Sequence, residues 1–380
     1  MALVNAICTS CSKTVEVDST KDAWVCPHCS TPFIVDKAIR KYRSEHKNVA
    51  KKVKAVKKNS ADFEVKDGVL TAYKGSSEEV TIPGDVHKIG DNVFENNTEL
   101  KKVIIHDKVT DIGGYAFRGC TALEEIKFPD SIKNIGTWAF RGCTALKELV
   151  LPPQLRHLSD CLFADCSALE SVELPDLLTE IGAFAFSGCK SLKAIDIPKY
   201  VAQIGKYAFS GCEKIERIIV PEGVSLIEEC AFANCVSLAA VGLPKTIKSL
   251  GASSFQNCSA LKSIDIPGGV LSVDGFRGCT GLRSLEIPAG VTAVGDFSGC
   301  TNLERISLPA SLKKVSGGFT DCPKLTTISW ANLSDNAVNF PAYYETVVAS
   351  RKTAGKCVYC GGDFKLLSKV CKICGKKKDY

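Results

Sequence analysis

Two groups of four cysteines, one near each end of the chain, are the residues with the clearest capacity for chemistry. Each group contains two Cys-x2-Cys pairs, which are separated by 14 residues in the first group and by 10 in the second. The groups are Cys8, Cys11, Cys26 and Cys29, and then Cys357, Cys360, Cys371 and Cys374. Two such pairs supply four thiolates, which form the tetrahedral sulfur site typical of structural zinc. The sequence therefore predicts two structural zinc ions as cofactors.

Both quartets resemble zinc ribbons, the second with a shorter loop. The resemblance implies two small metal-stabilised domains, at residues 1–36 and 353–380. Four sulfur ligands leave no open coordination position, which favours a structural role over a catalytic one. Iron–sulfur binding is an alternative for four thiolates, although paired knuckles favour zinc. Redox chemistry at a Cys-x2-Cys pair would need a thioredoxin-like βαβ context, which the sequence lacks.

Between the two quartets, one unit of 21 to 23 residues recurs eleven times. Its most regular marker is a phenylalanine that is followed three residues later by a cysteine at ten of the eleven positions. The phenylalanines are Phe94, Phe117, Phe140, Phe163, Phe186, Phe209, Phe232, Phe255, Phe276, Phe297 and Phe319. A period of about 20 to 50 residues predicts stacked units and not a globule with one cleft.

The unit Leu123–Cys143 shows what each repeat contains. Residues 123–128 alternate apolar and polar side chains at their end, which predicts a short strand. Pro129 follows and closes that strand, because proline has no N–H to donate to a ladder. Residues 132–136 predict a second short extended segment or tight turn. Stacked units of this kind should form two parallel ladders of short strands.

The cysteine that follows each phenylalanine predicts a column along the stack. Its members are Cys120, Cys143, Cys166, Cys189, Cys212, Cys235, Cys258, Cys279, Cys300 and Cys322. In-register side chains should run parallel into the core, too far apart for disulfides. We expect a column of small buried apolar groups, with redox or metal use as the alternative. Asn97 takes the cysteine's place in the first unit.

The pattern L-x-x-I-x-I-P-x-x-I-x-x-I-G-x-x-A-F-x-x-C resembles the BspA-like class of leucine-rich repeats over about residues 78–330. The resemblance implies a mainly β fold: a leucine-rich-repeat solenoid of about 11 turns with parallel ladders, here flanked by two zinc ribbons. We assign residues 60–335 to this solenoid, with a capping hairpin at 62–73 that turns at Asp67-Gly68. Members of the class are generally interaction or adhesion proteins, which implies a protein partner and no enzymatic activity.

Two connectors join the solenoid to the ribbons, and both regions are basic. Residues 37–59 are predicted to be a basic helical connector, and residues 336–352 a second helical connector. The charge is +9 over residues 37–58 and +7 over residues 351–380, whereas residues 59–350 carry −8. The first connector is interpreted as a spacer helix, a partner-binding helix, or a surface for nucleic acid or anionic membrane. Nucleic acid would then bind residues 37–58 and 365–378.

Two columns of the repeat are candidate partner-binding positions. The outward strand position is acidic at Glu173, Asp196, Asp265 and Glu286. The position two residues before the repeat phenylalanine is aromatic at Tyr115, Trp138, Phe184 and Tyr207. Stacked aromatics either support the solenoid or form an apolar strip that a partner covers. For the acidic column, ordinary solvent exposure is the alternative.

The remaining sequence signals argue against an enzyme and against a membrane span. No metalloprotease, Walker, dinucleotide, nucleophile-elbow or deaminase motif occurs, and no catalytic residue is predicted. No apolar run reaches the length of a bilayer span. The N-terminal residues show no export signal, so we expect a cytoplasmic protein with reduced thiols. The leading hypothesis is a protein–protein interaction scaffold, with a nucleic-acid-binding protein and a cell-surface adhesin as alternatives.

Overall fold

The computed structural model divides the chain into two compact units, residues 1–59 and 60–380. It describes residues 3–8, 14–18, 23–27, 32–35, 38, 60–330, 352, 355–357, 363, 370–371 and 377. The solenoid is thus described throughout residues 60–330. Of the two predicted helical connectors, only Ala38 and Lys352 fall within the described residues, and both are helical.

The N-terminal unit contains two antiparallel hairpins. Strand β1 (Leu3–Ile7) pairs with β2 (Thr14–Asp18), and β3 (Ala23–Val25) pairs with β4 (Pro32–Ile34). Alternation along β2 buries Val15 and exposes Glu16, as expected for a strand with one face on a core. One small cluster collects the buried side chains: Ala6, Cys8, Val15, Val17, Cys26, Val35 and Ala38.

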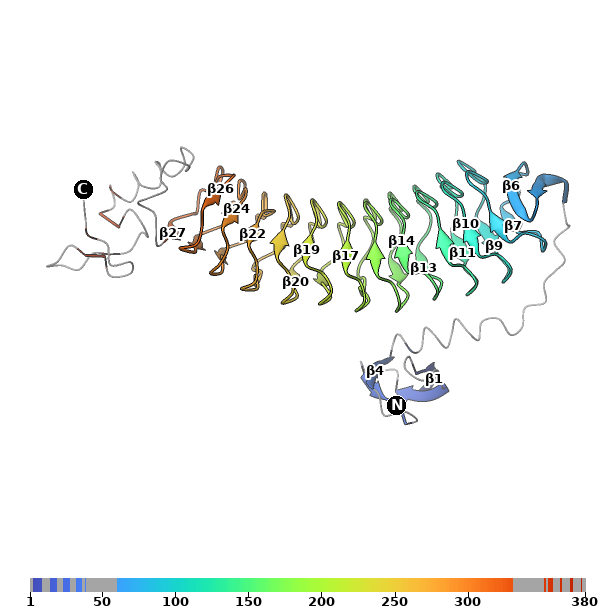
Figure 1. The fold of residues 1–380 in the computed structure, drawn as a ribbon, viewed down its shortest axis with the longest axis horizontal. Helices are drawn as coiled ribbons and strands as arrows, with labels where there is room; N and C mark the ends of the chain where they lie inside the picture. Colours follow the sequence, from blue (N-terminus) through green and yellow to red (C-terminus); the bar gives the residue numbers. More distant parts are fainter. Residues whose placement is uncertain are drawn as a thin grey trace. The chain divides into compact units, whose positions relative to one another are not determined.

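The turns of the second unit stack in sequence order into a solenoid whose strands form two parallel ladders (Figure 1). The first ladder contains β7 (Glu79–Thr81), β9 (Lys102–Ile104), β11 (Glu125–Lys127), β13 (Glu148–Val150), β15 (Ser171–Glu173), β18 (Arg217–Ile219), β20 (Ala240–Gly242), β23 (Ser284–Glu286), β25 (Arg305–Leu308) and β27 (Thr327–Trp330). The second contains β8 (Lys88–Ile89), β10 (Asp111–Ile112), β12 (Asn134–Ile135), β14 (His157–Leu158), β16 (Glu180–Ile181), β17 (Gln203–Ile204), β19 (Leu226–Ile227), β21 (Ser249–Leu250), β22 (Ser272–Val273), β24 (Ala293–Val294) and β26 (Lys314–Val315). The predicted solenoid of about 11 turns with parallel ladders is confirmed.

A third side of each turn carries the repeat phenylalanine in an arc of tight turns. Neighbouring arcs are joined by backbone hydrogen bonds, such as Phe94 N–H to Ala116 O at 2.8 Å and Phe117 N–H to Ala139 O at 2.8 Å. The residue two positions after each phenylalanine has φ between 57° and 77°, and is Gly at most turns and Asn or Asp at the others. These are the residue types that tolerate the left-handed region, so the sequence pattern explains the arc.

The eleven repeat phenylalanines form the centre of the core. All are buried, and successive rings stack with centroids 5.0 to 6.1 Å apart. The stack continues into the predicted N-terminal cap, since Tyr73 lies 5.1 Å from both Phe63 and Phe94. This cap is the confirmed hairpin of β5 (Phe63–Lys66) and β6 (Val69–Tyr73), which follows the 3-10 helix η1 (Ser60–Asp62). Parallel pairing of β6 with β8 joins the cap to the second ladder.

The strand ladders are less regular than the repeat. Residues 194–196 and 263–265 occupy first-ladder positions but form no strand beyond one bridge, Ser171 to Ala194. Both segments carry an outward aspartate, Asp196 or Asp265, and aspartate is a poor strand former. Both ladders are also interrupted between the turn that contains β11 and β12 and the turn that contains β13 and β14. There the arcs stay bonded, with Phe140 N–H to Leu162 O at 3.0 Å.

Candidate metal centres and interaction surfaces

Two cysteines of the N-terminal quartet, Cys8 and Cys26, directly follow the first strands of the two hairpins. Cys8 directly follows β1, whose Ile7 pairs with Thr14, and Cys26 directly follows β3, whose Val25 pairs with Pro32. Cys8 and Cys26 are both fully buried in the same small cluster, which is the arrangement that two zinc knuckles require. Cys11 and Cys29 lie outside the described residues.

The C-terminal quartet shows a related arrangement around two buried cysteines, Cys357 and Cys371. An antiparallel bridge between Val370 and Lys377 encloses the pair that begins at Cys371. An ion pair between Lys356 and Asp363, at 2.5 Å, encloses the pair that begins at Cys357. The partners Cys360 and Cys374 lie outside the described residues.

The chemistry of the two quartets fits zinc. Four thiolates in two Cys-x2-Cys pairs are the ligand set of structural zinc, and a segment of about 30 residues would gain most of its folding free energy from the metal. Within the described ranges, no group of three or more His, Cys, Asp or Glu is gathered as a metal site, and only two cysteines of each quartet belong to those ranges. Zinc therefore stays a prediction.

The cysteine column of the solenoid is a chain of hydrogen bonds. Every member, from Cys120 to Cys322, donates its S–H to the carbonyl of the repeat phenylalanine in the preceding turn, with S···O distances of 3.0 to 3.2 Å. All ten are buried. The thiol is small enough to fit the core. It also gives the buried phenylalanine carbonyl a second hydrogen bond, which an apolar side chain of similar size could not donate. This confirms the buried column and adds a bonding role that the sequence did not predict.

Burial also makes these thiols unreactive. It raises the pKa of Cys120, Cys235 and Cys279 to about 12. At the end of the column, a hydrogen bond between Cys300 and Cys322 raises the pKa of Cys300 and lowers that of Cys322. Since the thiolate is the reactive form, the column should be inert until the solenoid unfolds, except at its C-terminal end.

A thiol-counting experiment tests this arrangement. In the native protein with zinc bound, a thiol reagent at pH 8 is expected to modify Cys230 first, because it is the one described cysteine that is not buried. Cys322 should follow slowly, and the other column cysteines should react only in denaturant. Cys230→Ser is the matched control and should remove the fast phase alone. Rapid modification of most of the 20 cysteines in native protein would contradict the column.

The aromatic column is half-buried and stacked upon itself. Tyr115 and Trp138 stack at 5.9 Å, and Phe184 and Tyr207 at 4.6 Å, while the buried Cys161 separates the two pairs. All five have φ between 55° and 64°, a conformation that costs bulky side chains free energy. Stacking along the column offsets that cost. Support of the solenoid, one of the two interpretations from the sequence, accounts for this geometry.

Arginines cover part of the aromatic column. The Arg141 guanidinium lies 4.4 Å from the Trp138 ring centroid and its Nε is 3.0 Å from the Asp165 carboxylate in the next turn. The Arg118 guanidinium lies between Tyr115 and Trp138, at 5.5 and 5.7 Å from their centroids. Such cation–π contacts leave little of Tyr115 and Trp138 free for a partner. Phe184, at 38% exposure, is the most accessible member.

The outward positions of the first ladder are open to solvent. Asp196, Asp265 and Glu286 are exposed and Glu173 is half-buried. Three apolar residues of the same column are exposed as well: Ile104 at 39%, Val150 at 55% and Ile219 at 71%. The structure thus brings the four predicted acidic residues onto one face of the solenoid, together with apolar side chains that the prediction did not include.

Comparison with known families decides the identity of this repeat. A model of the BspA type leucine rich repeat region matches residues 71–193, 179–296 and 271–346, in 6 copies. The chain belongs to this family. No curated protein matches the chain.

Solved structures of leucine-rich repeat proteins resemble this BspA-type chain. A leucine rich cell surface protein from Faecalibacterium prausnitzii is 28% identical over 72% of this chain and 90% of its own, with a TM-score of 0.44. A leucine-rich repeat protein from Bacteroides ovatus is 25% identical over 72% of this chain and 94% of its own, with a TM-score of 0.45. In the described part of the chain, no helix has the length and apolar character needed to cross a bilayer.

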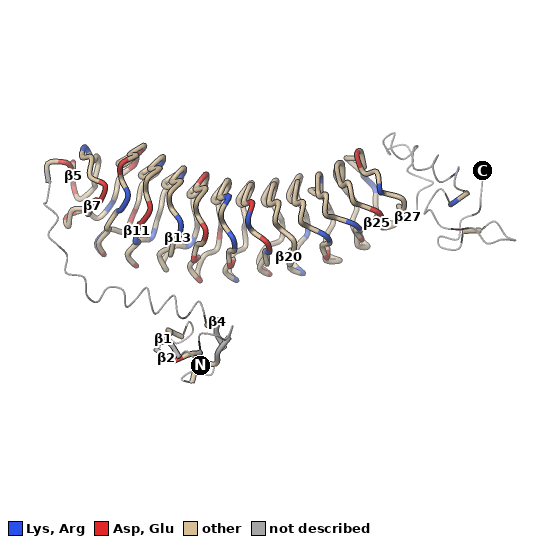
Figure 2. Tube along the Cα trace, turned by 180° about the vertical axis from the view of Figure 1, so that it is seen from behind, with Lys and Arg blue, Asp and Glu red and all other residues tan. Residues whose placement is uncertain are grey.

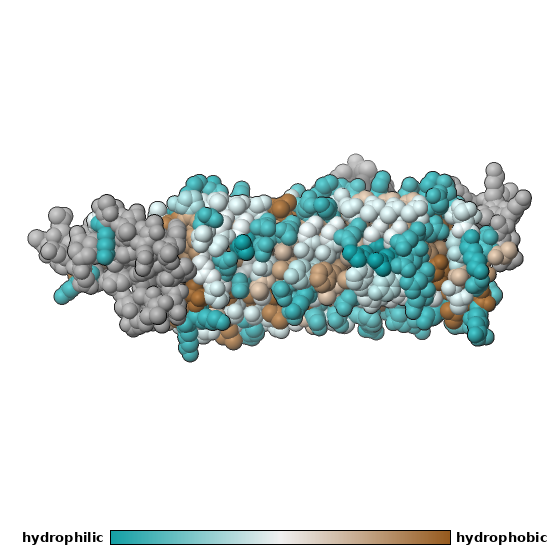
Figure 3. Space-filling model, turned by 90° about the horizontal axis from the view of Figure 1, so that it is seen from above, coloured by the Kyte–Doolittle hydropathy of each residue, from teal (hydrophilic) through white to brown (hydrophobic). Residues whose placement is uncertain are grey.

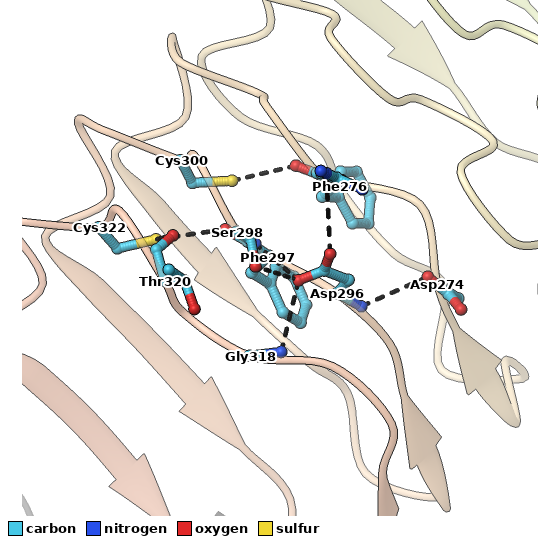
Figure 4. Close-up of polar contacts among 10 residues, drawn as sticks. Asp274, Phe276, Asp296, Phe297, Ser298, Cys300, Gly318, Thr320 and Cys322 are labelled. Carbon is cyan, nitrogen blue, oxygen red and sulfur yellow. Dashed lines mark hydrogen bonds and ion pairs between the residues drawn. The ribbon is translucent and has the colours of Figure 1, made fainter. Parts of the chain in front are cut away.

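The last turns of the BspA-type solenoid contain a polar network that sequence reasoning missed (Figure 4). Oδ1 of Asp296 accepts hydrogen bonds from the N–H of Ser298 at 2.9 Å, its hydroxyl at 2.5 Å, and the N–H of Gly318 at 3.4 Å. Oδ1 of Asp274 accepts the N–H of Asp296 at 3.4 Å. These carboxylates join turns that are one or two residues shorter than the others. The sequence signal for this network is an aspartate two residues before Phe276 and another directly before Phe297.

The two aspartates have opposite pKa shifts. Burial raises the pKa of Asp274, and the nearby Asp296 carboxylate adds to this. Burial acts in the same direction on Asp296, but the hydrogen bonds from Ser298 and Gly318 outweigh it and lower the pKa. Ionised Asp296 therefore stabilises the fold above its unfolded pKa, and this contribution is lost as pH falls through the lowered pKa. Ionised Asp274 costs stability at neutral pH, and the cost disappears as pH falls through the raised pKa.

Asp296→Asn is expected to lower the free energy of unfolding at pH 7 by about 1–2 kcal/mol, because charge-assisted hydrogen bonds are lost. Asp274→Asn should leave stability unchanged or raise it. Urea denaturation at pH 7 and at about pH 4 measures both effects, and both differences from wild type should shrink at the lower pH. A stability loss for Asp274→Asn that exceeds the loss for Asp296→Asn would contradict this assignment.

Proposed function

We propose that this protein is a non-enzymatic protein–protein interaction scaffold with a structural zinc ion at each end. The observation that carries the proposal is the contrast between the two sides of the first ladder. The inward-facing residues of these strands are of the same apolar types in every turn. The outward-facing residues differ from turn to turn and include the exposed Val150 and Ile219. A rigid surface of varied composition suits recognition of one extended partner. Figure 3 shows another face as a polar mosaic with scattered apolar side chains.

The experiment is site-specific photo-crosslinking at the strand face in cells of the native host. A photoreactive residue at Ile219 is expected to capture a defined partner, and Asp196→Lys or Val150→Glu should reduce the yield. A photoreactive residue at Leu271, which is 56% exposed beside the second ladder, is the matched control and should not capture that partner. Equal capture at both positions, or background alone at Ile219, would contradict a scaffold that uses the first ladder.

The state of the thiols also bears on the setting. The column thiols donate hydrogen bonds to phenylalanine carbonyls as S–H groups, and zinc thiolates need a reducing environment to persist. We therefore propose a cytoplasmic location for the scaffold. Zinc ribbons at the ends would dock further components or cap the chain.

Nucleic-acid binding is the second candidate, because positive charge is concentrated outside the solenoid, at residues 37–58 and 351–380. Binding would use residues 37–58 and 365–378. Replacement of Lys51, Lys52, Lys57 and Lys58 by Ser should then abolish a salt-dependent mobility shift. The charge of −8 on residues 59–350 opposes this function, and we rank it below the scaffold.

A further inference from the structure

A basic pocket lies where both ladders are interrupted, between the turn of β11 and β12 and the turn of β13 and β14. Its volume is about 420 Å³. The residues that line it are Lys133, Asn134, Pro153, Gln154, Arg156, His157 and Leu177. Three of these seven side chains are cationic or can become so. All seven lining residues are exposed, so the pocket is an open depression that a small ligand or one side chain of a partner could enter from solvent.

The backbone at this pocket lacks a hydrogen bond that most equivalent turns make; among the described turns, the bond from Ser225 N–H to Ala202 O is the other one missing. Thr179 N–H donates to Arg156 O at 2.7 Å, and Lys133 N–H donates to Thr110 O at 2.8 Å. In the described solenoid, the corresponding bond from Arg156 N–H to Lys133 O is missing. The two turns have parted here on the second-ladder side, and the Arg156 N–H is left as a donor at the wall of the pocket.

The cations of this pocket lie in a column beside the second ladder that lacks the charge alternation found beside the first ladder. One column beside the first ladder alternates in sign through seven turns: Glu78, Lys101, Glu124, Lys147, Glu170, Lys193 and Glu216. Ion pairs such as Lys101–Glu78 at 2.8 Å and Lys193–Glu170 at 2.6 Å follow from it, and Figure 2 shows both signs interspersed along the turns. At the pocket, in contrast, Lys133 and Arg156 occupy the same position in neighbouring turns.

Like charges in neighbouring strands destabilise a ladder unless something neutralises them. Among the described residues, neither Lys133 nor Arg156 has a side-chain hydrogen bond or an ion pair within 4.0 Å, and the same holds for His157. The amide groups of the pocket are already used, since Gln154 Nε2 donates to Asp130 O at 2.8 Å and Asn134 Nδ2 to Asp111 Oδ1 at 2.7 Å. The unmatched groups are therefore the cations.

Asp111 and Glu180 lie near this face, and neither forms a hydrogen bond or ion pair with Lys133, Arg156 or His157 among the described contacts. The pKa of Asp111 is lowered: its burial acts upward, but hydrogen bonds from Thr110 and Asn134 and the charges of Lys88 and Lys133 outweigh it. Both oxygens of Asp111 thus already have donors. Glu180 is the register neighbour of His157 on the side away from Lys133.

We propose that this basic pocket binds a phosphoryl group. Arginine forms paired hydrogen bonds with phosphate oxygens, and a lysine on the neighbouring turn supplies a second charge. A phosphate monoester carries close to two negative charges at neutral pH, which matches Lys133 and Arg156, whereas a carboxylate carries one. His157 and the Arg156 N–H are the remaining donors. The phosphoryl group comes either from a free phosphate ester or from a phosphorylated residue of a partner.

The chain's five histidines allow a direct test by NMR of the full-length, zinc-loaded protein with labelled histidine rings. Titration with inorganic phosphate at constant ionic strength is expected to shift the His157 resonance to saturation at millimolar concentration. The resonances of His87 and His106, which lie outside the pocket, should stay in place. His157→Gln assigns the signal. Acetate at equal ionic strength should cause a much smaller shift.

The double variant Lys133→Ser/Arg156→Ser should weaken phosphate binding by about tenfold or more. Lys313→Ser/Lys314→Ser is the matched control, because it removes two cations from the positions equivalent to Arg156 and His157 in a turn with an intact ladder. It should leave the titration unchanged. No shift of His157 with phosphate, an equal shift with acetate, or equal losses in both double variants would overturn the proposal.

A short phosphoserine peptide identifies the source of the group. Tighter binding of the peptide than of inorganic phosphate, at the same resonance, assigns the pocket to a phosphorylated partner, and equal binding assigns it to a free phosphate ester. Because this titration contains no partner protein, its outcome is independent of the scaffold proposal.

Discussion

Removal of zinc is expected to unfold both ends of the chain and to leave the solenoid folded. Metal binding contributes about 10–16 kcal/mol to the folding of small zinc domains, and the described residues of the N-terminal unit bury one small cluster, which includes Cys8 and Cys26. Metal analysis should find two zinc ions per chain. After treatment with a strong chelator, hydrogen exchange should become fast in β1 to β4 and stay slow in the arcs from Phe94 to Phe319.

Cys8→Ser and Cys357→Ser separate the two sites. Each should remove one zinc ion and unfold only its own end, while the melting of the solenoid stays unchanged. Cys189→Ser is the matched control, since Cys189 belongs to the buried column and binds no metal in this assignment. A zinc content near zero in reducing, chelator-free buffer would contradict both metal sites.

Phe186→Ala is expected to destabilise the solenoid by about 3–5 kcal/mol, the usual cost of deleting a buried aromatic ring. Phe186 is fully buried and stacks on Phe163 at 5.6 Å and on Phe209 at 5.5 Å. Its loss therefore leaves a cavity with ring faces on both sides. Urea denaturation followed by circular dichroism measures the change.

Phe184→Ala is the matched control for Phe186→Ala. The two residues are two positions apart, but Phe184 is 38% exposed and has φ of 56°. Removal of its ring costs stacking on Tyr207 but creates no buried cavity, so the loss should be much smaller. Equal losses in the two variants would mean that the central stack of rings is not the main source of stability.

The regular part of the fold could be predicted because each repeated residue has one physical role. Pro129 and most of its equivalents follow the end of a strand, and the Asp67-Gly68 turn specifies the capping hairpin through its positive φ values of 49° and 71°. The phenylalanine period predicted stacked turns, since no other arrangement buries eleven equivalent rings. These signals are local, and they recur in nearly every turn.

Features that depend on two neighbouring turns at once could not be predicted in this way. The S–H of Cys143 donates to the carbonyl of Phe117, 26 residues earlier. The presence of a cysteine in the sequence does not indicate which carbonyl accepts its hydrogen bond. Trp138 has a left-handed backbone conformation, which tryptophan rarely adopts. The arc of tight turns requires that conformation at this position. The lost strands at Asp196 and Asp265, and the parted turns at Arg156, depart from the repeat at positions where the repeat pattern predicted continuity.

For the candidate sites, the cysteine spacing specifies a ligand type, whereas no spacing specifies which surface is exposed. The structure buries Cys8 and Cys26 directly after β1 and β3, and the knuckles and their zinc stay a prediction. The aromatic column was a candidate partner surface, but its rings stack on one another beneath Arg118 and Arg141. Whether a side chain is exposed depends on the side chains of the adjacent turns. The sequence of a single repeat therefore does not predict the exposure of its residues.

The thiol bonds of the cysteine column have an evolutionary consequence. Where the unit is 23 residues long, each bond spans one unit plus three residues, as between Cys189 and Phe163. Deleting or duplicating one whole unit would present every remaining thiol with an equivalent acceptor, whereas a shift of a few residues would leave donors and acceptors mismatched along the break. Unequal recombination in the gene should therefore change the length of such a protein in whole units, and the reach of its surface could grow or shrink without redesign of its interior.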